Sequence, residues 1–187
     1  MRILGISGSL RRDSWNWKLL LAAQELLPPG VGPEIWDGLK AVPPYDEDDD
    51  VQPAPAPVAR MRAAIAGADG VLFATPEYNS SVPGQLKNAL DWVSRPIATN
   101  VLRNKPVAVI GASTGAFGAV WSQAELRKVL SAIGARVVEG EVPVGHAPEK
   151  FDEQGRLIDP EIREQLKELV ELLVAEARPQ RIVPIAA

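Results

Sequence analysis

Hydroxyl, guanidinium and glycine groups gather near the start of the chain, in the segment GSLRRDSWN at residues 8–16. Gly8 permits close backbone approach, Ser9 and Ser14 offer hydroxyl donors, and Arg11 or Arg12 offers a guanidinium fork. Ser14 is a preferred N-cap residue, so we expect a helix to begin there and to add unpaired backbone N–H groups. This combination is suited to holding a dianionic phosphate.

The segment matches neither of the two common glycine-rich phosphate motifs. A dinucleotide fingerprint requires G-x-G-x-x-G and a Walker loop requires G-x-x-x-x-G-K-[ST], and the residues after Gly5 and Gly8 fit neither spacing. An ordinary capped turn between a strand and a helix would also contain Ser, Asp and Gly. The first loop alone therefore leaves a phosphate site and a plain turn open.

Two later loops carry further groups suited to binding. The segment at 76–84 holds Glu77, Tyr78 and Asn79 between two prolines, and the segment at 111–118 is rich in glycine. An aromatic face, a carboxamide and exposed backbone N–H groups would together suit a flat, partly polar heterocycle. Taken singly, the same residues could serve only to cover the core edge or to reverse the chain.

Five short apolar segments alternate with segments of helical spacing. Strands are expected at residues 2–6, 33–36, 70–75, 106–112 and 136–144, and helices at 15–27, 58–66, 85–93, 119–133 and 160–177. This alternation predicts a doubly wound α/β domain, with a five-stranded parallel sheet and helices on both faces. Ligands bind beyond the carboxyl ends of such strands, so the three loops should converge on one crevice.

Composition narrows the class of protein. With 187 residues and 46% hydrophobic content, the chain most simply forms one domain, expected at 1–178, followed by a C-terminal tail at 179–187. A net charge of −4 argues against a nucleic-acid partner. The absence of cysteine excludes disulfides and thiolate chemistry, and one histidine argues against a His-rich metal site, so no metal site is assigned.

Hydropathy and local charge add three smaller expectations. No apolar run approaches the roughly 20 residues of a spanning helix and no signal segment is present, so we expect a cytoplasmic protein without membrane insertion. The acidic run at 46–50 lies in a long proline-rich loop and is interpreted as a solvated surface. His146 is interpreted as a surface turn residue.

Because these three loops follow one another in this order along the chain, the sequence resembles the NAD(P)H-dependent FMN reductase family. The resemblance rests on GSLRxxSxN at 8–16, PEYN at 76–79 with VPGQLKNALDW at 82–92, and GASxG at 111–115. It implies a flavodoxin-like fold, a non-covalent FMN, and NADPH or NADH as hydride donor. It also implies that the electron acceptor is a flavin, a quinone or a similar small molecule, and that the protein is a homodimer or a homotetramer. We add the hypothesis that donor and acceptor react in a ping-pong cycle.

The resemblance places the FMN phosphate at the first loop and the isoalloxazine ring between the other two. The cofactor-binding residues expected on this basis are Ser9, Arg11, Ser14, Trp15, Asn16, Pro76, Glu77, Tyr78, Asn79, Ser80, Ser113 and Gly115. No side chain is assigned as a general acid or base, because hydride transfer is chemistry that a flavin itself carries.

The chain departs from the family pattern at three positions. Asp13 stands where relatives commonly have Gly, Thr114 where Pro is frequent, and Trp121 where Arg is frequent. We expect Asp13 to turn away from the phosphate site as a residue of the helix start. Two other functions stay open: a flavodoxin-like electron carrier without nicotinamide turnover, and a non-enzymatic binding module that kept only the scaffold.

Overall fold

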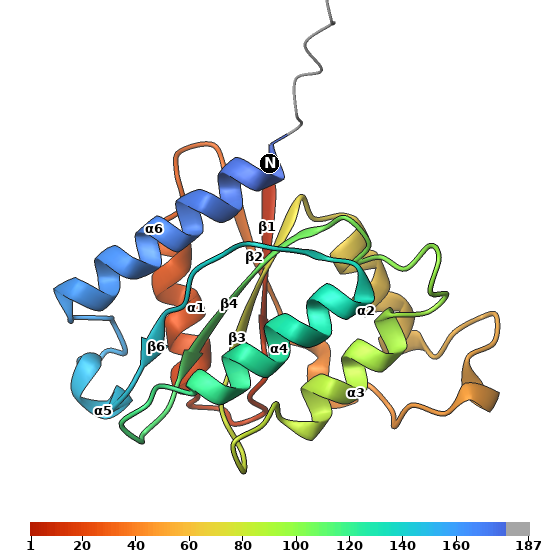
Figure 1. The fold of residues 1–187 in the computed structure, drawn as a ribbon, viewed down its shortest axis with the longest axis horizontal. Helices are drawn as coiled ribbons and strands as arrows, with labels where there is room; N and C mark the ends of the chain where they lie inside the picture. Colours follow the sequence, from red (N-terminus) through yellow and green to blue (C-terminus); the bar gives the residue numbers. More distant parts are fainter. Residues whose placement is uncertain (179–187) are drawn as a thin grey trace, which may run out of the picture.

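A parallel β-sheet with the strand order β2–β1–β3–β4–β5 forms the centre of the protein (Figure 1). A computed structural model describes residues 1–178, and the tail expected at 179–187 lies outside them. The strands are β1 (Arg2–Ser7), β2 (Gly32–Trp36), β3 (Gly70–Thr75), β4 (Pro106–Ala112), β5 (Arg136–Val137) and β6 (Pro143–Val144). This order is that of flavodoxin-like sheets, so the predicted fold class is confirmed.

Helices cover both faces of the sheet. They are α1 (Trp15–Glu25), α2 (Ala56–Ala66), α3 (Gly84–Val93), α4 (Val120–Ile133), α5 (Ala147–Lys150) and α6 (Pro160–Ala177), with 3₁₀ segments η1 (Gly38–Ala41) and η2 (Glu47–Asp49) in the long loop after β2. Buried residues of α1 and α6 form one core cluster with the sheet, and those of α2, α3 and α4 form the other. Within residues 1–178, no helix combines the length and the apolar character needed to cross a membrane.

The central strands explain why the sequence shows continuous apolar runs instead of alternation. Every residue of β3 and β4 is buried. Along β3, Val71 and Phe73 belong to the core cluster of α2, α3 and α4, whereas Leu72 and Ala74 belong to that of α1 and α6. A strand covered on both faces needs apolar side chains at every position.

The fifth strand is interrupted, in contrast to the continuous strand expected at 136–144. β5 pairs with the beginning of β4 and β6 pairs with its end, so both pieces lie beside the same strand. Between the two pieces Gly140 has a φ of 133°, which favours glycine, and Pro143, the first residue of β6, has no N–H group to donate to a ladder. The chain therefore leaves β4 and returns to it at the carboxyl edge of the sheet.

Candidate functional site

A cavity of about 270 Å³ lies at the carboxyl edge of the sheet, where β1, β3 and β4 end. We call it the main cleft. It is lined by Ser9, Arg11, Ser14, Trp15, Asn16, Pro76, Glu77, Tyr78, Ala112, Ser113 and Thr114. The three loops that follow these strands lie together at the lower edge of the view in Figure 1. The expected convergence of the loops is therefore present.

Most of the expected cofactor-binding residues line the main cleft. The exceptions are Asn79, Ser80 and Gly115, which belong to the same loops but lie outside the lining. Ala112 and Thr114 line the cleft and were not predicted. Their position in the sequence could have indicated this, because they flank the predicted Ser113 at the end of an apolar strand.

Hydroxyl groups shape the first loop and the start of α1. Ser14 has an extended backbone and its Oγ accepts a hydrogen bond of 3.2 Å from the backbone N–H of Asn16, as an N-cap does. Ser9 Oγ accepts one of 3.4 Å from the backbone N–H of Arg11. Since the first residues of α1 line the main cleft, the positive end of the helix dipole faces it.

Asn16 joins the first turn of α1 to the end of β4. It is buried, and its carboxamide makes two hydrogen bonds of 2.9 Å with Ala112, donating to the carbonyl and accepting from the N–H. Both ends of the carboxamide are thus engaged by the protein. Asn16 lines the main cleft as expected. Its side chain holds the start of α1 and the end of β4, which form two walls of the cleft, at a fixed separation.

Arg11 supplies the positive charge of the first loop. It is exposed, lines the main cleft and makes no ion pair within residues 1–178. Asp13, two residues later, points elsewhere: its Oδ1 lies 2.7 Å from Lys18 Nζ, and this contact lowers the pKa of Asp13. Asp13 does not line the cleft and turns outward as expected, so it does not compete for an anion there.

The second loop is a tight turn. Tyr78 and Ser81 exchange two backbone hydrogen bonds of 3.2 and 3.1 Å, and Asn79 and Ser80 between them have φ values of 53° and 59°. Positive φ at both central positions is the pattern of a type I′ turn, in which Asn is favoured. Tyr78 keeps about half of its surface exposed, at 53%, beside the main cleft.

Carboxylates attach this turn to α4. Glu77 Oε2 accepts a hydrogen bond of 3.0 Å from the backbone N–H of Ser122. Glu125 Oε2 accepts one of 2.6 Å from the Ser81 hydroxyl and one of 3.2 Å from the Val82 N–H. These two donors lower the pKa of Glu125. This contact leaves no signal in the sequence, because its partners lie on separate elements.

The third loop is held by the segment that follows β6. Ser113 O accepts a hydrogen bond of 3.0 Å from the Ala147 N–H, and Gly115 O accepts one of 2.9 Å from the N–H of His146. The side chain of His146 is exposed. The loop continues into Phe117, which forms an edge-to-face pair with Trp121 at 5.1 Å between ring centroids. Both residues are exposed.

The chemistry of the main cleft fits a mononucleotide such as FMN. One end offers two hydroxyls, one guanidinium and the start of a helix, which suit a phosphate. The other end offers Tyr78, Pro76 and the backbone of the third loop, which suit a planar ring. Within residues 1–178, no three His, Cys, Asp or Glu side chains gather as metal ligands would.

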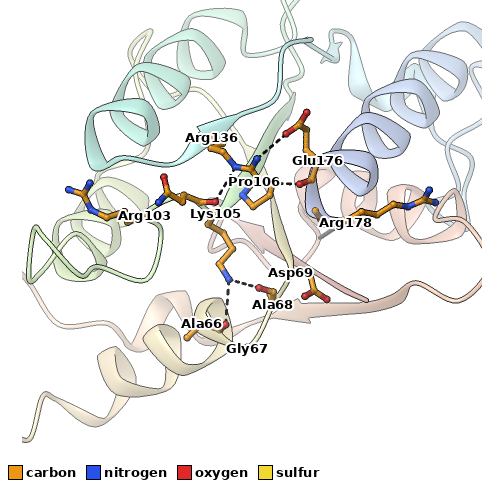
Figure 2. A pocket seen from close by; sticks show the side chains of 12 residues that line it. Ala66, Gly67, Ala68, Asp69, Arg103, Lys105, Pro106, Arg136, Glu176 and Arg178 are labelled. Atoms are coloured by element: carbon orange, nitrogen blue, oxygen red, sulfur yellow. Dashed lines mark hydrogen bonds and ion pairs between the residues drawn. The ribbon is translucent and has the colours of Figure 1, made fainter. Parts of the chain in front are cut away.

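A larger cavity, of about 600 Å³, lies at the opposite edge of the sheet, where the strands begin (Figure 2). Two of its cations are engaged by the protein: Arg136 bonds to Glu176, and Lys105 donates to the carbonyls of Ala66 and Ala68. None of the predicted site residues lines it. Size alone therefore does not identify the functional site.

The strand order, with a cleft at the carboxyl ends of the strands, defines a flavodoxin-like α/β protein. Residues 1–149 match the family described as NADPH-dependent FMN reductase. The chain belongs to this family. It is therefore an oxidoreductase of the NAD(P)H-dependent FMN reductase and quinone reductase type, with FMN as its cofactor.

Individual relatives agree with this assignment. The chain is 42% identical over 174 residues to an NAD(P)H-dependent FMN reductase of Pseudomonas aeruginosa, covering 92% of this chain and 93% of the relative. It is 36% identical over 183 residues to 2-hydroxy-1,4-benzoquinone reductase of a Burkholderia species, covering 97% and 99%. Among solved structures it is similar to FerB, a flavoenzyme NAD(P)H:acceptor oxidoreductase of Paracoccus denitrificans, with a TM-score of 0.82, 34% identity and coverage of 94% and 96%.

Proposed function

We propose that residues 1–178 form one FMN-binding domain that transfers electrons from NAD(P)H to a quinone or a free flavin in a ping-pong cycle. The observation that carries this proposal is the main cleft, in which Ser9, Arg11 and Ser14 meet the start of α1 beside the turn at Tyr78. Ser9, Arg11 and Ser14 would hold the phosphate of FMN, with Asn16 keeping the wall in place. The second and third loops would frame its ring.

The protein's own residues act by binding and orientation. When bound, FMN supplies the chemistry of accepting a hydride and passing electrons to the acceptor. Glu77 is the acidic side chain in the cleft lining, and it is engaged by the backbone N–H of Ser122, so it anchors the loop. Tyr78 lines the cleft and is half-exposed, and donor and acceptor would enter in turn past its ring.

An anaerobic stopped-flow experiment tests this function. The FMN-loaded protein is mixed with NADPH or NADH, the flavin absorbance is followed, and 1,4-benzoquinone is then added. We expect rapid bleaching followed by full recovery of the absorbance on quinone addition. Bound flavin that neither nucleotide bleaches would favour an electron carrier, and failure to bind FMN would favour a binding module.

We also propose a homodimer or homotetramer, acting in the cytoplasm, where NAD(P)H is supplied. Support comes from Phe117 in the third loop and Trp121 in the first turn of α4, which leave 64% and 49% of their surfaces exposed. Sedimentation velocity of Trp121→Glu should show a shift toward monomer relative to the unchanged protein. Ile158→Glu, at a similarly exposed apolar residue before α6, should keep the native assembly and serves as control.

A further inference from the structure

A third cavity, of about 360 Å³, lies beside the first loop at the ends of β1 and β2. We call it the basic cavity. It is lined by Ser7, Ser9, Leu10, Arg11, Arg12, Trp17, Trp36, Asp37, Leu39 and Lys40. Ser9 and Arg11 line this cavity and the main cleft alike, so the first loop forms a wall that the two share.

Cations without acidic partners gather in the basic cavity. Arg11, Arg12 and Lys40 are exposed and form no ion pair within the part of the chain that the structure describes, although Asp37 lines the same cavity. The chain as a whole carries a net charge of −4. Three cations against the single carboxylate of Asp37 give this cavity a net positive charge and a local preference for anions.

Indole rings give the same cavity flat apolar surfaces. Trp17 comes from α1 and Trp36 from the last residue of β2, and both are half-buried. The buried Leu39 adds an aliphatic surface. Indole faces favour planar rings, and neighbouring guanidinium and ammonium groups favour phosphates. The combination is suited to a phosphorylated aromatic ligand.

We propose that the basic cavity binds the adenosine phosphate half of NAD(P)H. This proposal rests on the proposed function, because the dinucleotide enters as its electron donor. A dinucleotide whose nicotinamide reaches the main cleft can extend across the shared wall at Ser9 and Arg11. Arg12 and Lys40 line only the basic cavity, so they remain free for the donor's phosphates while Arg11 serves FMN. Trp17 and Trp36 supply the faces on which adenine packs.

Calorimetric titration of the FMN-loaded protein with 2′,5′-ADP tests this site directly. We expect binding of one equivalent, weakened about tenfold in Arg12→Ala and again in Lys40→Ala, the loss expected for one charge-assisted hydrogen bond. Arg60→Ala removes an exposed cation of α2 outside both cavities and should leave the affinity unchanged. Absence of binding, or equal affinity in all four proteins, would overturn the proposal.

Steady-state kinetics then separate the dinucleotide from a free adenine nucleotide. The KM for NADPH should rise about tenfold in Arg12→Ala and Lys40→Ala, whereas the KM for reduced nicotinamide mononucleotide, which lacks the adenosine half, should stay constant. Equal changes for both donors, or no change for either, would refute the assignment to NAD(P)H. A protein that binds 2′,5′-ADP but oxidises neither donor would contradict the proposed function instead.

Discussion

The carboxamide of Asn16 binds the backbone of Ala112 in both directions, donating to its carbonyl and accepting from its N–H, each at 2.9 Å. A side chain at the start of α1 thereby takes the place of a strand on the β3 side of Ala112, because the pairing of β3 with β4 ends one residue earlier, at Thr75 and Gly111. Both groups are buried, so each depends on the other for its hydrogen bonds. The width of the main cleft is fixed at this contact.

The substitution Asn16→Asp keeps the shape of the side chain but should disrupt its contact with the backbone of Ala112. A carboxylate cannot donate to the Ala112 carbonyl, and a buried charge would face a carbonyl oxygen. We expect a loss of about 3 kcal/mol or more in the free energy of unfolding, measured by chemical denaturation. Asp13→Asn, in the same loop but facing Lys18, should cost far less. Equal losses in the two variants would contradict this role of Asn16.

Arg11→Ala should reveal whether the first loop holds a phosphate. Loss of a guanidinium on a phosphate should raise the Kd for FMN about 10- to 100-fold, measured by quenching of flavin fluorescence. Riboflavin, which has no phosphate, should bind both proteins equally. Arg12→Ala is the matched control, because Arg12 lines only the basic cavity and should leave the affinity for FMN unchanged. A parallel loss of riboflavin binding would point to a general disturbance of the loop.

Glu125→Gln should loosen the turn at 78–81. A neutral amide accepts the hydrogen bonds of Ser81 and Val82 less strongly than a carboxylate, and solvent already screens this exposed side chain. We therefore expect a modest rise, of about threefold, in the Kd for FMN at neutral pH. Glu168→Gln, at an exposed position of α6, should not change it.

The same contact predicts a pH dependence with a definite sign. Hydrogen bonds from Ser81 and Val82 place the pKa of Glu125 in the folded protein below its ordinary value of 4.5. The contact therefore contributes fully above the ordinary value and is lost as the pH falls through the lowered pKa. Thermal melts of the unchanged protein and Glu125→Gln should differ at pH 7 and converge below pH about 4. A difference that grows on acidification would contradict this assignment.

Gly145→Ala should test how tightly the third loop is supported. A Cβ at Gly145 would lie 2.1 Å from the carbonyl oxygen of Ala116, so the loop would have to move. We expect a loss of about 2 kcal/mol in the free energy of unfolding and weaker FMN binding. Gly84→Ala, at the start of α3 with open space around it, should instead be neutral or stabilise by about 0.5 kcal/mol.

Local patterns were sufficient to predict the sheet and the main cleft. The apolar runs at 70–75 and 106–112 are β3 and β4 with the predicted bounds, because strands buried on both faces have few alternatives. The helix start at Ser14 followed from its capping chemistry. Helix ends were less well predicted: α1 ends at Glu25 instead of residue 27, and α2 begins at Ala56 instead of residue 58.

Features that depend on partners distant in the sequence were not predictable. The interruption between β5 and β6 was missed, because the valines around Gly140 match a continuous strand. Glu125 gave no signal as a loop anchor, since its partner Ser81 lies 44 residues away on another element. The basic cavity was also missed: Arg12, Trp36 and Lys40 come together only through the pairing of β1 with β2.

The interrupted fifth strand also protects an open border of the sheet. A long, regular border strand would offer unpaired backbone groups to other chains, whereas β5 and β6 offer two residues each. Between them Arg127 donates to the carbonyls of Val138 and Gly140, which removes two acceptors from this border. The addition of a strand from another chain, and aggregation through this edge, are therefore disfavoured. Copies of the protein would associate through side-chain contacts instead of backbone pairing at this edge.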